Sequence, residues 1–268
     1  MSEAAAGCVV LDASVPAPLR ERLAASPVPA REPAFRLRRR DDMLGLEALA
    51  EPGLGTLEVE LLRGRTGWRG SSRARHERLV RACGLTRAGH EADRVLDGTG
   101  GLGTDAWLLA NAGARVRVME QHPVLRALLE DGLRRAGEQH PEVAARIRVE
   151  HGDSRVVLAT PEQVRGIDVL YLDPMYPERR KAALGDRRLR LVAALLAADG
   201  IAGDDAAGLV NAGLASGIGR VVLKRPARVR VSASRPPGHS LEGRSTRFDV
   251  WVSPVPSSAA APAADAPR

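Results

Sequence analysis

The sequence predicts an α/β protein built on a doubly wound, mostly parallel sheet, and three observations support this fold class. Segments with a strand pattern alternate with segments of helical periodicity from residue 94 to residue 226, an order that is typical of parallel sheets. A glycine-rich loop at residues 98–103 follows the first of these strands, where doubly wound folds bind their ligands. A last strand-like segment, residues 246–252, predicts an antiparallel strand that closes the sheet.

Residues 1–62 predict a small β-rich N-terminal lobe. A short apolar run at residues 8–11 predicts one strand, and the stretch that follows it is rich in alanine and proline. From residue 35 to residue 62, hydrophobic residues alternate with polar ones around a turn at residues 51–55. Alternation with a period of two is the pattern of half-buried strands, so we expect a small sheet here.

Residues 63–90 predict a basic, partly helical connector, with an amphipathic helix at residues 73–83. Eight arginines in this stretch stand against one acidic residue, Glu77. A solvated helix face is the alternative, but a helix that only needs to be soluble does not require charges of one sign. We therefore expect contact with a phosphate backbone through Arg63, Arg65, Arg69, Arg73, Arg75 and Arg78.

Residues 91–252 predict a ligand-binding domain, and the Ala/Pro-rich residues 253–268 predict a disordered tail. The largely apolar strand at residues 167–173 predicts a central position in the sheet. The Pro- and Ser-rich segment up to residue 244 predicts a loop. Further strands are expected at residues 115–120, 147–150 and 220–224, and helices at residues 123–135, 187–198 and 204–215.

The composition indicates a protein that contacts polyanions. The chain has 268 residues and a net charge of +7, carried by 38 arginines and two lysines. Codon bias explains arginine over lysine but not the excess of base over acid, so nucleic acid is the favoured partner. With no secretory signal and no apolar run of bilayer length, we expect a cytoplasmic protein. Two cysteines, Cys8 and Cys83, and no grouping with ligand spacing predict neither disulfides nor a metal site.

The glycine loop predicts a nucleotide-like cofactor, because Gly98, Gly100 and Gly103 open a helix directly after a strand. Dehydrogenases and methyltransferases both use such loops, and both place an acid such as Glu120 beside ribose hydroxyls. Asp97 precedes the loop, and its carboxylate suits a cofactor with an ammonium group, such as S-adenosylmethionine (SAM), while it would repel a pyrophosphate. A strand-end cap is the alternative role for Asp97.

A second motif, Asp173-Pro174-Met175-Tyr176-Pro177, stands at the end of the fourth predicted strand. Ligands of open α/β sheets bind beyond the carboxyl ends of the strands, so Asp173 and the glycine loop should share one crevice. The Asp173 carboxylate and the Pro174 carbonyl can accept from an exocyclic amine, and Tyr176 can stack on a flat base. The motif therefore predicts methyl transfer to an amine, with a strand followed by a proline turn as the alternative.

Two further polar groups follow neighbouring strands. His151, Asp153 and Ser154 stand where such folds contact adenine, although Asp153 or Ser154 could equally cap a helix. Lys224 and Arg225 follow the fifth predicted strand and are expected to hold phosphate near the target base, with a simple surface pair as the alternative.

Four stretches of the chain carry a resemblance to a known family. They read V-L-D-G-T-G-G-L-G-T-D-A-W-L-L-A, V-M-E-Q-H-P-V-L-R-A-L-L-E-D-G-L, Y-L-D-P-M-Y-P and R-V-V-L-K-R-P. Together they resemble the RsmJ family of bacterial 16S rRNA (guanine-N2)-methyltransferases, over about residues 55–252. The resemblance implies a Rossmann-like class I methyltransferase fold, SAM as the cofactor and a guanine amine of small-subunit rRNA as the acceptor.

The resemblance also implies roles for individual residues. The implied cofactor contacts are Thr104, Asp105, Glu120, Gln121, Asp153, Ser154 and Asp173. Asp173 would accept from the amine and Tyr176 would hold a base that has left its stack, and the methyl group would move in one direct displacement. The partner would be 16S rRNA or the small ribosomal subunit, bound by the connector arginines together with Lys224 and Arg225.

Three other functions stay open alongside this one. A SAM-dependent methyltransferase could act on a DNA base or a protein amine, which labelled methyl transfer to each fraction would reveal. An NAD-dependent oxidoreductase could use the same glycine loop, and thermal shifts with S-adenosylhomocysteine and with NAD would separate the two. A non-catalytic RNA-binding module would fail to bind S-adenosylhomocysteine.

Overall fold

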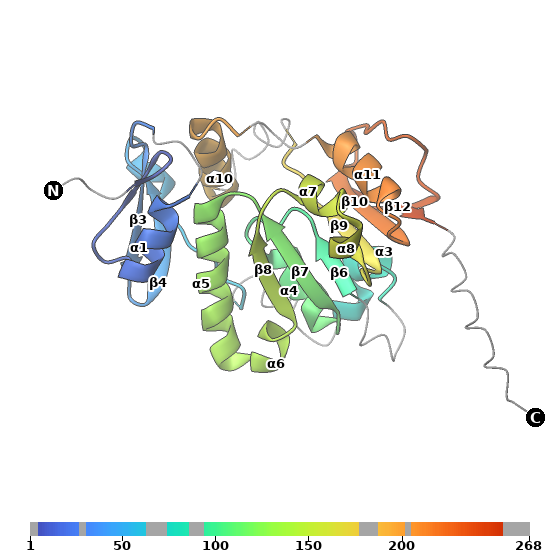
Figure 1. The fold of residues 1–268 in the computed structure, drawn as a ribbon, viewed down its shortest axis with the longest axis horizontal. Helices are drawn as coiled ribbons and strands as arrows, with labels where there is room; N and C mark the ends of the chain where they lie inside the picture. Colours follow the sequence, from blue (N-terminus) through green and yellow to red (C-terminus); the bar gives the residue numbers. More distant parts are fainter. Residues whose placement is uncertain are drawn as a thin grey trace, which may run out of the picture.

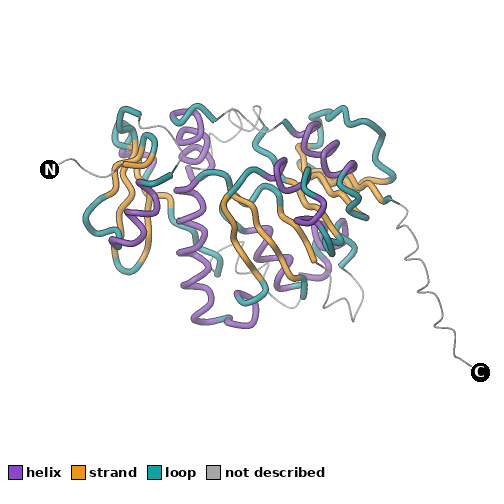
Figure 2. The backbone as a smooth tube through the Cα atoms, viewed as in Figure 1, coloured by secondary structure: helices purple, strands orange, loops and turns teal. Residues whose placement is uncertain are grey.

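The structure, a computed structural model, describes residues 5–26, 31–62, 74–85, 94–176, 187–201 and 205–253. Two sheets lie on either side of a long helix, the smaller one at the N-terminal end (Figures 1 and 2). The expected disordered tail lies outside the described residues except for Ser253. In the described part of the chain, no helix has the length and apolar character needed to cross a membrane.

The large sheet has seven strands in the order β11-β12-β10-β9-β6-β7-β8. Strands β10, β9, β6, β7 and β8 run parallel, and β12 is antiparallel to both of its neighbours, which confirms the predicted parallel sheet and closing strand. The strands are β6 (Arg94–Asp97), β7 (Arg115–Glu120), β8 (Ile147–His151), β9 (Val169–Leu172), β10 (Arg220–Pro226), β11 (His239–Glu242) and β12 (Thr246–Val252).

Burial explains the central position of β9. All four of its residues are buried, and it pairs with β6 on one side and β10 on the other, as its apolar sequence predicts. The expectation of a loop up to residue 244 is wrong at β11, which pairs with β12 from His239↔Val250 to Glu242↔Arg247. Its sequence has one hydrophobic residue, Leu241, so the hydrogen bonds offered by β12 form this strand without a hydrophobic pattern.

Helices cover the sheet and surround its carboxyl edge. The predicted helix at residues 123–135 extends to Gln139, and Asp205 accepts from Gly208 N to cap the helix expected at residues 204–215. The helices of this domain are α4 (Thr104–Asn111), α5 (Pro123–Gln139), α6 (Pro141–Ala144), α7 (Ser154–Leu158), α8 (Pro161–Val164), α10 (Arg187–Ala198) and α11 (Ala206–Ala215).

The helix predicted at residues 73–83 is wrong in its length. The described part holds a 3-10 turn, Ala74–His76, and a separate short helix, α3 (Arg78–Ala82). Glu77 between them has extended backbone angles, φ −65° and ψ 142°, so the helical hydrogen bonds cannot continue through it. Leu79 and Val80 of α3 are buried, and Arg78 is exposed.

The N-terminal lobe is a five-stranded sheet in sequence order, with one helix, α1 (Ala17–Ala24), between its second and third strands. A two-residue turn joins β3 to β4, and its residues Asp41 and Asp42 have φ of 47° and 61°. Such angles are those of type I′ turns, which match the twist of a hairpin. The strands are β1 (Ala5–Ala6), β2 (Val9–Leu11), β3 (Phe35–Arg40), β4 (Met43–Ala48) and β5 (Thr56–Leu57), and a 3-10 turn, Pro52–Leu54, fills the predicted turn.

Helix α5 joins the lobe to the large sheet, since it contacts β4 on one side and β7 and β8 on the other. Its buried Asp131 accepts from Arg39 Nη2 at 2.9 Å and from Leu44 N at 3.1 Å. Beside it, a Cβ on Gly132 would lie 2.4 Å from Val59 Cγ1, so only glycine permits this close approach. Hydrophobic residues of both sheets belong to one continuous core.

Candidate cofactor and acceptor site

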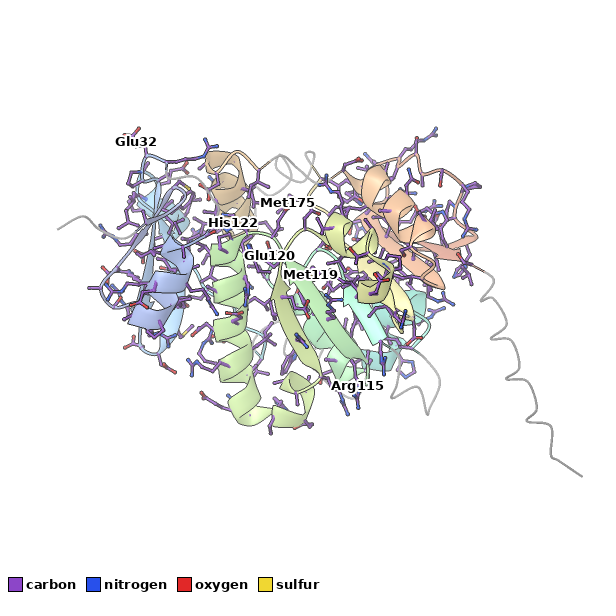
Figure 3. The ribbon with its side chains drawn as sticks, viewed as in Figure 1. Glu32, Arg115, Met119, Glu120, His122 and Met175 are labelled. Carbon is purple, nitrogen blue, oxygen red and sulfur yellow. The ribbon has the colours of Figure 1, made fainter. Side chains whose placement is uncertain are left out.

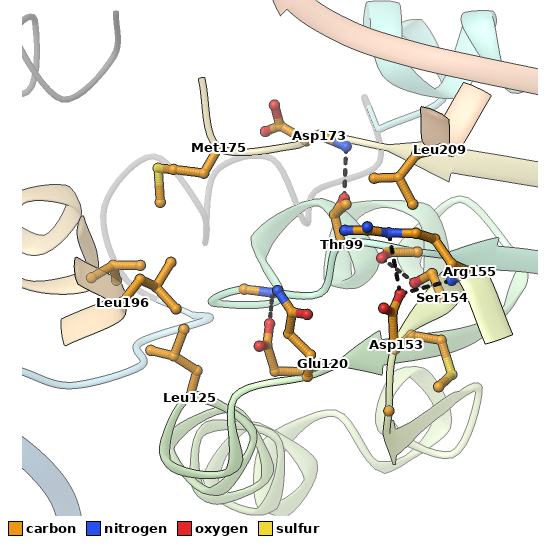
Figure 4. Close-up of a pocket in the computed structure, with 16 residues that line it drawn as sticks. Thr99, Glu120, Leu125, Asp153, Ser154, Arg155, Asp173, Met175, Leu196 and Leu209 are labelled. Carbon is orange, nitrogen blue, oxygen red and sulfur yellow. Dashed lines mark hydrogen bonds and ion pairs between the residues drawn. The ribbon is translucent and has the colours of Figure 1, made fainter. Parts of the chain in front are cut away.

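A pocket lies at the carboxyl ends of the parallel strands, where the two predicted motifs meet (Figure 4). Its walls come from the loop after β6, the end of β7, the turn after β8 and the segment after β9, and side chains of α5, α10 and α11 close it. The lining residues are Gly98, Thr99, Gly101, Met119, Glu120, Gln121, Leu125, Gly152, Asp153, Ser154, Arg155, Asp173, Met175, Val192, Leu196 and Leu209.

The glycine loop packs closely against its neighbours. Gly100 N donates to Met119 O at 2.8 Å, and a Cβ on Gly100 would lie 2.9 Å from that same oxygen. Gly103 begins α4 with φ of 71°, and a Cβ there would lie 2.2 Å from Leu129 Cδ1. Gly98 lines the pocket, whereas Gly100 and Gly103 do not. These two glycines are required by packing against β7 and α5.

Glu120 is held in place at the end of β7. Its Oε2 accepts from Gly101 N and its Oε1 from His122 N, both at 2.7 Å. The residue is 7% exposed and lines the pocket together with Gln121. Two backbone donors therefore fix the carboxylate in the position where such folds bind ribose hydroxyls.

His122 begins α5 and ties the site to the lobe. Its Nδ1 accepts from Val124 N and Leu125 N at 3.2 and 3.4 Å, and its Nε2 lies 2.9 Å from Asp199 Oδ2. Because Nδ1 accepts, Nε2 carries the hydrogen and donates it to Asp199. The other oxygen of Asp199 accepts from Cys8 N of the lobe at 2.8 Å.

The contact between Asp199 and Cys8 affects the pKa values of both side chains. Burial alone would raise the pKa of Asp199, but hydrogen bonds from His122 and Cys8 lower it. Burial, together with Asp199, raises the pKa of the Cys8 thiol to about 12, so Cys8 is a structural residue with little thiolate.

The turn after β8 combines a helix cap with the pocket wall. Asp153 Oδ1 accepts from Arg155 N at 2.8 Å and caps α7, which is the alternative that the sequence left open. The Ser154 hydroxyl donates to Gly98 O and connects this turn to the glycine loop. Both residues also line the pocket, so the cap and a ligand contact do not exclude each other.

A carboxylate cluster lies beside the pocket, formed by the buried Asp97 and the partly buried Asp105 and Asp173 around the partly buried Lys224. Lys224 Nζ is 2.8 Å from Asp173 Oδ2 and makes a second ion pair with Asp105 Oδ2. The Tyr171 hydroxyl donates to the same Asp105 oxygen at 2.6 Å. The backbone of Asp173 is also fixed, because its N–H donates to Thr99 Oγ1 at 2.7 Å.

The pKa values of Asp97 and Lys224 in the cluster, and of the neighbouring Tyr171, are shifted. Burial raises the pKa of Asp97 to about 7, a hydrogen bond from Thr99 N opposes this, and the charges of Asp105 and Asp173 add to it. Burial alone would lower the pKa of Lys224, but the two carboxylates in contact with it raise it above its usual value. Burial and the same carboxylates raise the pKa of Tyr171.

Comparison with known proteins identifies the family. The SAM-dependent methyltransferase family model, SAM_MT, matches residues 21–253. Ribosomal RNA small subunit methyltransferase J of Alkalilimnicola ehrlichii is 41% identical over 224 residues, which cover 83% of this chain and 84% of that protein. The protein of the same name from Shewanella oneidensis is 40% identical over 223 residues, covering 81% and 86%. The chain belongs to the ribosomal RNA small subunit methyltransferase J family.

The fold agrees with this membership. The crystal structure of a SAM-dependent methyltransferase from Neisseria gonorrhoeae matches with a TM-score of 0.66 and 27% identity, covering 91% of this chain and 95% of that one. The methyltransferase J family is SAM-dependent, so the cofactor of the chain is SAM.

The residues of the pocket fit this cofactor chemically. A carboxylate, glycine backbone and polar turn residues stand beside apolar side chains such as Met119 and Leu125, as a molecule with a flat base, a ribose and a charged tail requires. The cavity measures about 90 Å³, less than the roughly 300 Å³ at the lower end of ligand pockets. The cavity as it stands is therefore smaller than a site that encloses a whole ligand.

The structure places only some of the predicted cofactor residues of this methyltransferase J chain around the pocket. Gly98, Glu120, Gln121, Asp153, Ser154 and Asp173 line it, whereas Asp97, Gly100, Gly103, Thr104 and Asp105 do not. Asp97 and Asp105 lie in the carboxylate cluster instead. In the part of the chain that the structure describes, no three His, Cys, Asp or Glu side chains are placed to hold a metal ion.

The structure gives Lys224 and Arg225 partners inside the protein, and their contact with a phosphate stays a prediction. The Lys224 ammonium group forms ion pairs with two carboxylates of the protein itself, those of Asp105 and Asp173. Arg225 is 8% exposed, its Nε lies 2.5 Å from Asp249 Oδ2, and its Nη1 donates to Val229 O. Arg225 therefore anchors the segment after β10 and is largely shielded from solvent.

Tyr176 and Pro174 do not line the pocket. The Tyr176 ring is 5% exposed, packs in the core with Leu172, and donates its hydroxyl hydrogen to Lys224 O at 3.2 Å. Stacking of a base on Tyr176 stays a prediction, and it requires the ring to become exposed. Pro177 of the same motif lies outside the described residues.

Most of the predicted RNA-binding arginines cannot be placed. Arg63, Arg65, Arg69 and Arg73 lie outside the described residues, as does the side chain of Arg75.

The pocket also contains residues that the sequence analysis did not predict. Thr99 could have been found from its position inside the glycine loop, whereas Val192 and Leu196 of α10 carry no motif and reach the pocket only through the fold.

Proposed function

We propose that the chain transfers a methyl group from SAM to the exocyclic N2 of a guanosine in 16S rRNA. The position of Asp173 carries this proposal. Asp173 lines the SAM pocket at the carboxyl end of β9, and its backbone N–H and its carboxylate are both held by neighbours. The relatives that match most of the chain are named as small-subunit rRNA methyltransferases.

Binding of SAM would use the lining residues in three groups. Glu120 and Gln121 would hold the ribose, and the turn with Asp153 and Ser154 would contact adenine. Met119, Leu125 and Leu196 would pack on the base. Asp97, which lies behind the pocket wall, would face the ammonium group of the methionine part, whose positive charge favours the ionised form of this buried carboxylate. When bound, SAM supplies a methyl group on a positively charged sulfur.

Asp173 would then orient the acceptor. Its carboxylate would accept an N–H of the guanine amine and so direct the nitrogen lone pair at the methyl carbon, with the Pro174 carbonyl as a second acceptor. Such alignment can contribute several kcal/mol to lowering a barrier. The proton that the amine loses after methylation would pass to the Asp173 carboxylate. Lys224, in contact with Asp173 Oδ2, would fix the direction of the carboxylate.

The domain organisation that follows is a lobe at residues 1–62, a connector at residues 63–90 and a catalytic domain at residues 91–252. The connector arginines Arg63, Arg65, Arg69, Arg73, Arg75 and Arg78 would bind the rRNA backbone. A substrate in the small ribosomal subunit would place the protein in the cytoplasm.

The test is methyl incorporation from tritiated SAM into four substrates: small subunits and naked 16S rRNA, both from cells that lack the enzyme, DNA, and a protein fraction. We expect label only in rRNA, recovered as N2-methylguanosine by mass spectrometry after nuclease digestion. Label in DNA or protein instead would contradict the proposal. Mass spectrometry of both substrates would show whether the naked RNA or the subunit is preferred.

Asp173→Ala should lower methyl transfer at least roughly 100-fold, because the aligned acceptor is lost, while S-adenosylhomocysteine still binds. Asp173→Asn separates alignment from proton acceptance, since an amide oxygen still accepts a hydrogen bond. Circular dichroism spectra and melting curves check that both variants fold. Full activity of the folded Ala variant would remove Asp173 from the mechanism.

A further inference from the structure

We propose that a basic groove at the amino ends of β6, β7 and β8 binds the phosphate backbone of the RNA substrate, remote from the site of methyl transfer. This inference rests on the proposed function, since it concerns the same substrate. The groove is open, has a volume of about 960 Å³, and lies at the opposite ends of the strands from the SAM pocket. Its six arginines are Arg94, Arg115, Arg117, Arg146, Arg148 and Arg165.

The groove exists because the connection from β8 to β9 is short. Residues 152–168 form two small helices, α7 and α8, and only the edge of α8 reaches this part of the sheet, through Glu162 and Gln163. A full-length helix in this position would cover the strand ends. Side chains on this face of the strands therefore stay accessible, and along β7 and β8 they are Arg115, Arg117, Arg148 and one acid, Glu150.

The strand register sets like charges beside each other. Arg94 of β6 is the partner of Arg115 on β7, and Arg117 is the partner of Arg148 on β8. Like charges on neighbouring strands destabilise a sheet. Glu150 offsets one pair, because it accepts from Arg117 Nε and Nη2 at 2.9 and 2.7 Å and lies 2.9 Å from Arg148 Nε. The other pair has no such acid between its members among the described residues.

Three of the arginines present their charge to solvent. Arg94, Arg115 and Arg165 are exposed, and within the described residues their guanidinium groups make no ion pair. Arg117 and Arg146 are braced by backbone oxygens, Gln163 O at 2.7 Å and Ala110 O at 3.2 Å. Arg117 and Arg146 are thus held in place, while Arg94, Arg115 and Arg165 carry uncompensated charges. This arrangement suits a polyanion, because each neutralised phosphate releases counterions on binding.

The groove lies so far from the SAM pocket that only a long ligand can reach both. Figure 3 shows Arg115 at one end of β7 and Met119 and Glu120 at the other. Five residue steps of about 3.3 Å separate Arg115 from Glu120, about 17 Å along the strand. A single nucleotide in the pocket cannot span this distance. A folded RNA can, with its target base at the carboxyl edge and a helical backbone along the groove.

The test compares two double variants with equal loss of charge. Arg115→Gln/Arg165→Gln removes charge from the groove. Arg36→Gln/Arg40→Gln removes two exposed arginines of the lobe sheet and serves as the control. Binding to 16S rRNA is measured by filter retention between 50 and 300 mM salt, with S-adenosylhomocysteine affinity, KM for rRNA and kcat alongside.

We expect the groove variant to bind rRNA roughly 5- to 30-fold more weakly near physiological salt and to show a salt slope smaller by about 1.8, from two lost phosphate contacts at about 0.9 each. KM should rise while kcat and S-adenosylhomocysteine affinity stay unchanged, and the control should change little. Equal weakening by both variants would mean that only net charge matters and would overturn the proposal. An unchanged salt slope would do the same.

The binding measurements need no turnover, so the two proposals fail separately. If the wild-type protein methylates 16S rRNA but the groove variant binds it normally, the groove proposal alone is lost. If the wild-type protein methylates no rRNA, the proposed function is lost, and rRNA affinity still reports on the groove.

Discussion

The two edges of the large sheet treat charge in opposite ways. At the carboxyl edge, Lys224 is enclosed by Asp105 and Asp173, and each group of the cluster has its partner inside the protein. At the amino edge, Arg94 and Arg115 are neighbours of the same sign and face solvent. Mutually compensated charges fix side-chain positions, whereas uncompensated charges attract a partner from outside. The carboxyl edge therefore holds its side chains in fixed positions, and the amino edge attracts a negatively charged partner.

The largest effect is expected where the compensation is removed. Lys224→Met leaves the partly buried Asp105 and Asp173 close together without their cation, and breaking a fully buried ion pair costs about 3–5 kcal/mol, an upper bound here. We expect the free energy of unfolding in urea to fall by up to this amount, with methyl transfer lost. Lys224→Arg should restore part of both, because it keeps the charge.

The matched control for Lys224→Met is Arg115→Met at the other edge. Its free energy of unfolding should change by less than about 0.5 kcal/mol, as for most surface positions. Similar losses in the two variants would mean that the two edges do not differ in the way we describe.

A smaller effect, dependent on pH, is expected at Asp97. Its pKa in the folded protein is about 7 against 3.8 for an ordinary aspartate, so its contribution to stability is fully present below pH 4 and is lost as pH rises through 7. Asp97→Asn lacks this change. The stability of the wild type relative to the variant should therefore fall by on the order of 2–3 kcal/mol between pH 5 and pH 8, measured by urea unfolding at each pH.

The pH dependence of ligand affinity is a second test of the role of Asp97. If its carboxylate faces the ammonium group of the cofactor, S-adenosylhomocysteine should bind more tightly as pH rises from 6 to 8, since binding requires the ionised form. Asp97→Asn should abolish this dependence in calorimetric titrations. The same pH dependence in wild type and variant would assign Asp97 the role of a strand-end cap.

The smallest effect is expected in the groove and has the opposite sign. Arg115→Gln relieves repulsion with Arg94, so the free energy of unfolding should rise by a few tenths of a kcal/mol at low salt, and the gain should vanish at high salt. A stability gain combined with weaker rRNA binding would sharpen the comparison. A stability loss in low salt would show that Arg115 serves the fold.

The sequence predicts the parts of this fold that local patterns control. The apolar run of β9 and the hydrophobic periodicity of α5 identify both elements. Strand β11 has no such pattern, because its position depends on hydrogen bonds to β12. The proximity of Lys224 to Asp105, 119 positions away, depends on the strand order, and the burial of Arg225 depends on Asp249 in another strand. Motifs identified the glycine loop and Asp173, but they could not say which charges are compensated.

A path of hydrogen bonds connects the pocket with the N-terminal lobe. From Glu120 it runs through the His122 amide and ring to Asp199, and from there to the amide of Cys8 in the lobe. A ligand on Glu120 that tightens this path should slow hydrogen exchange at the Cys8 amide, because exchange requires that hydrogen bond to open. Exchange mass spectrometry with and without S-adenosylhomocysteine would measure the effect, and an unchanged rate would show that lobe and pocket open independently. With slower exchange, the lobe, whose described residues do not line the pocket, would report whether the cofactor is bound.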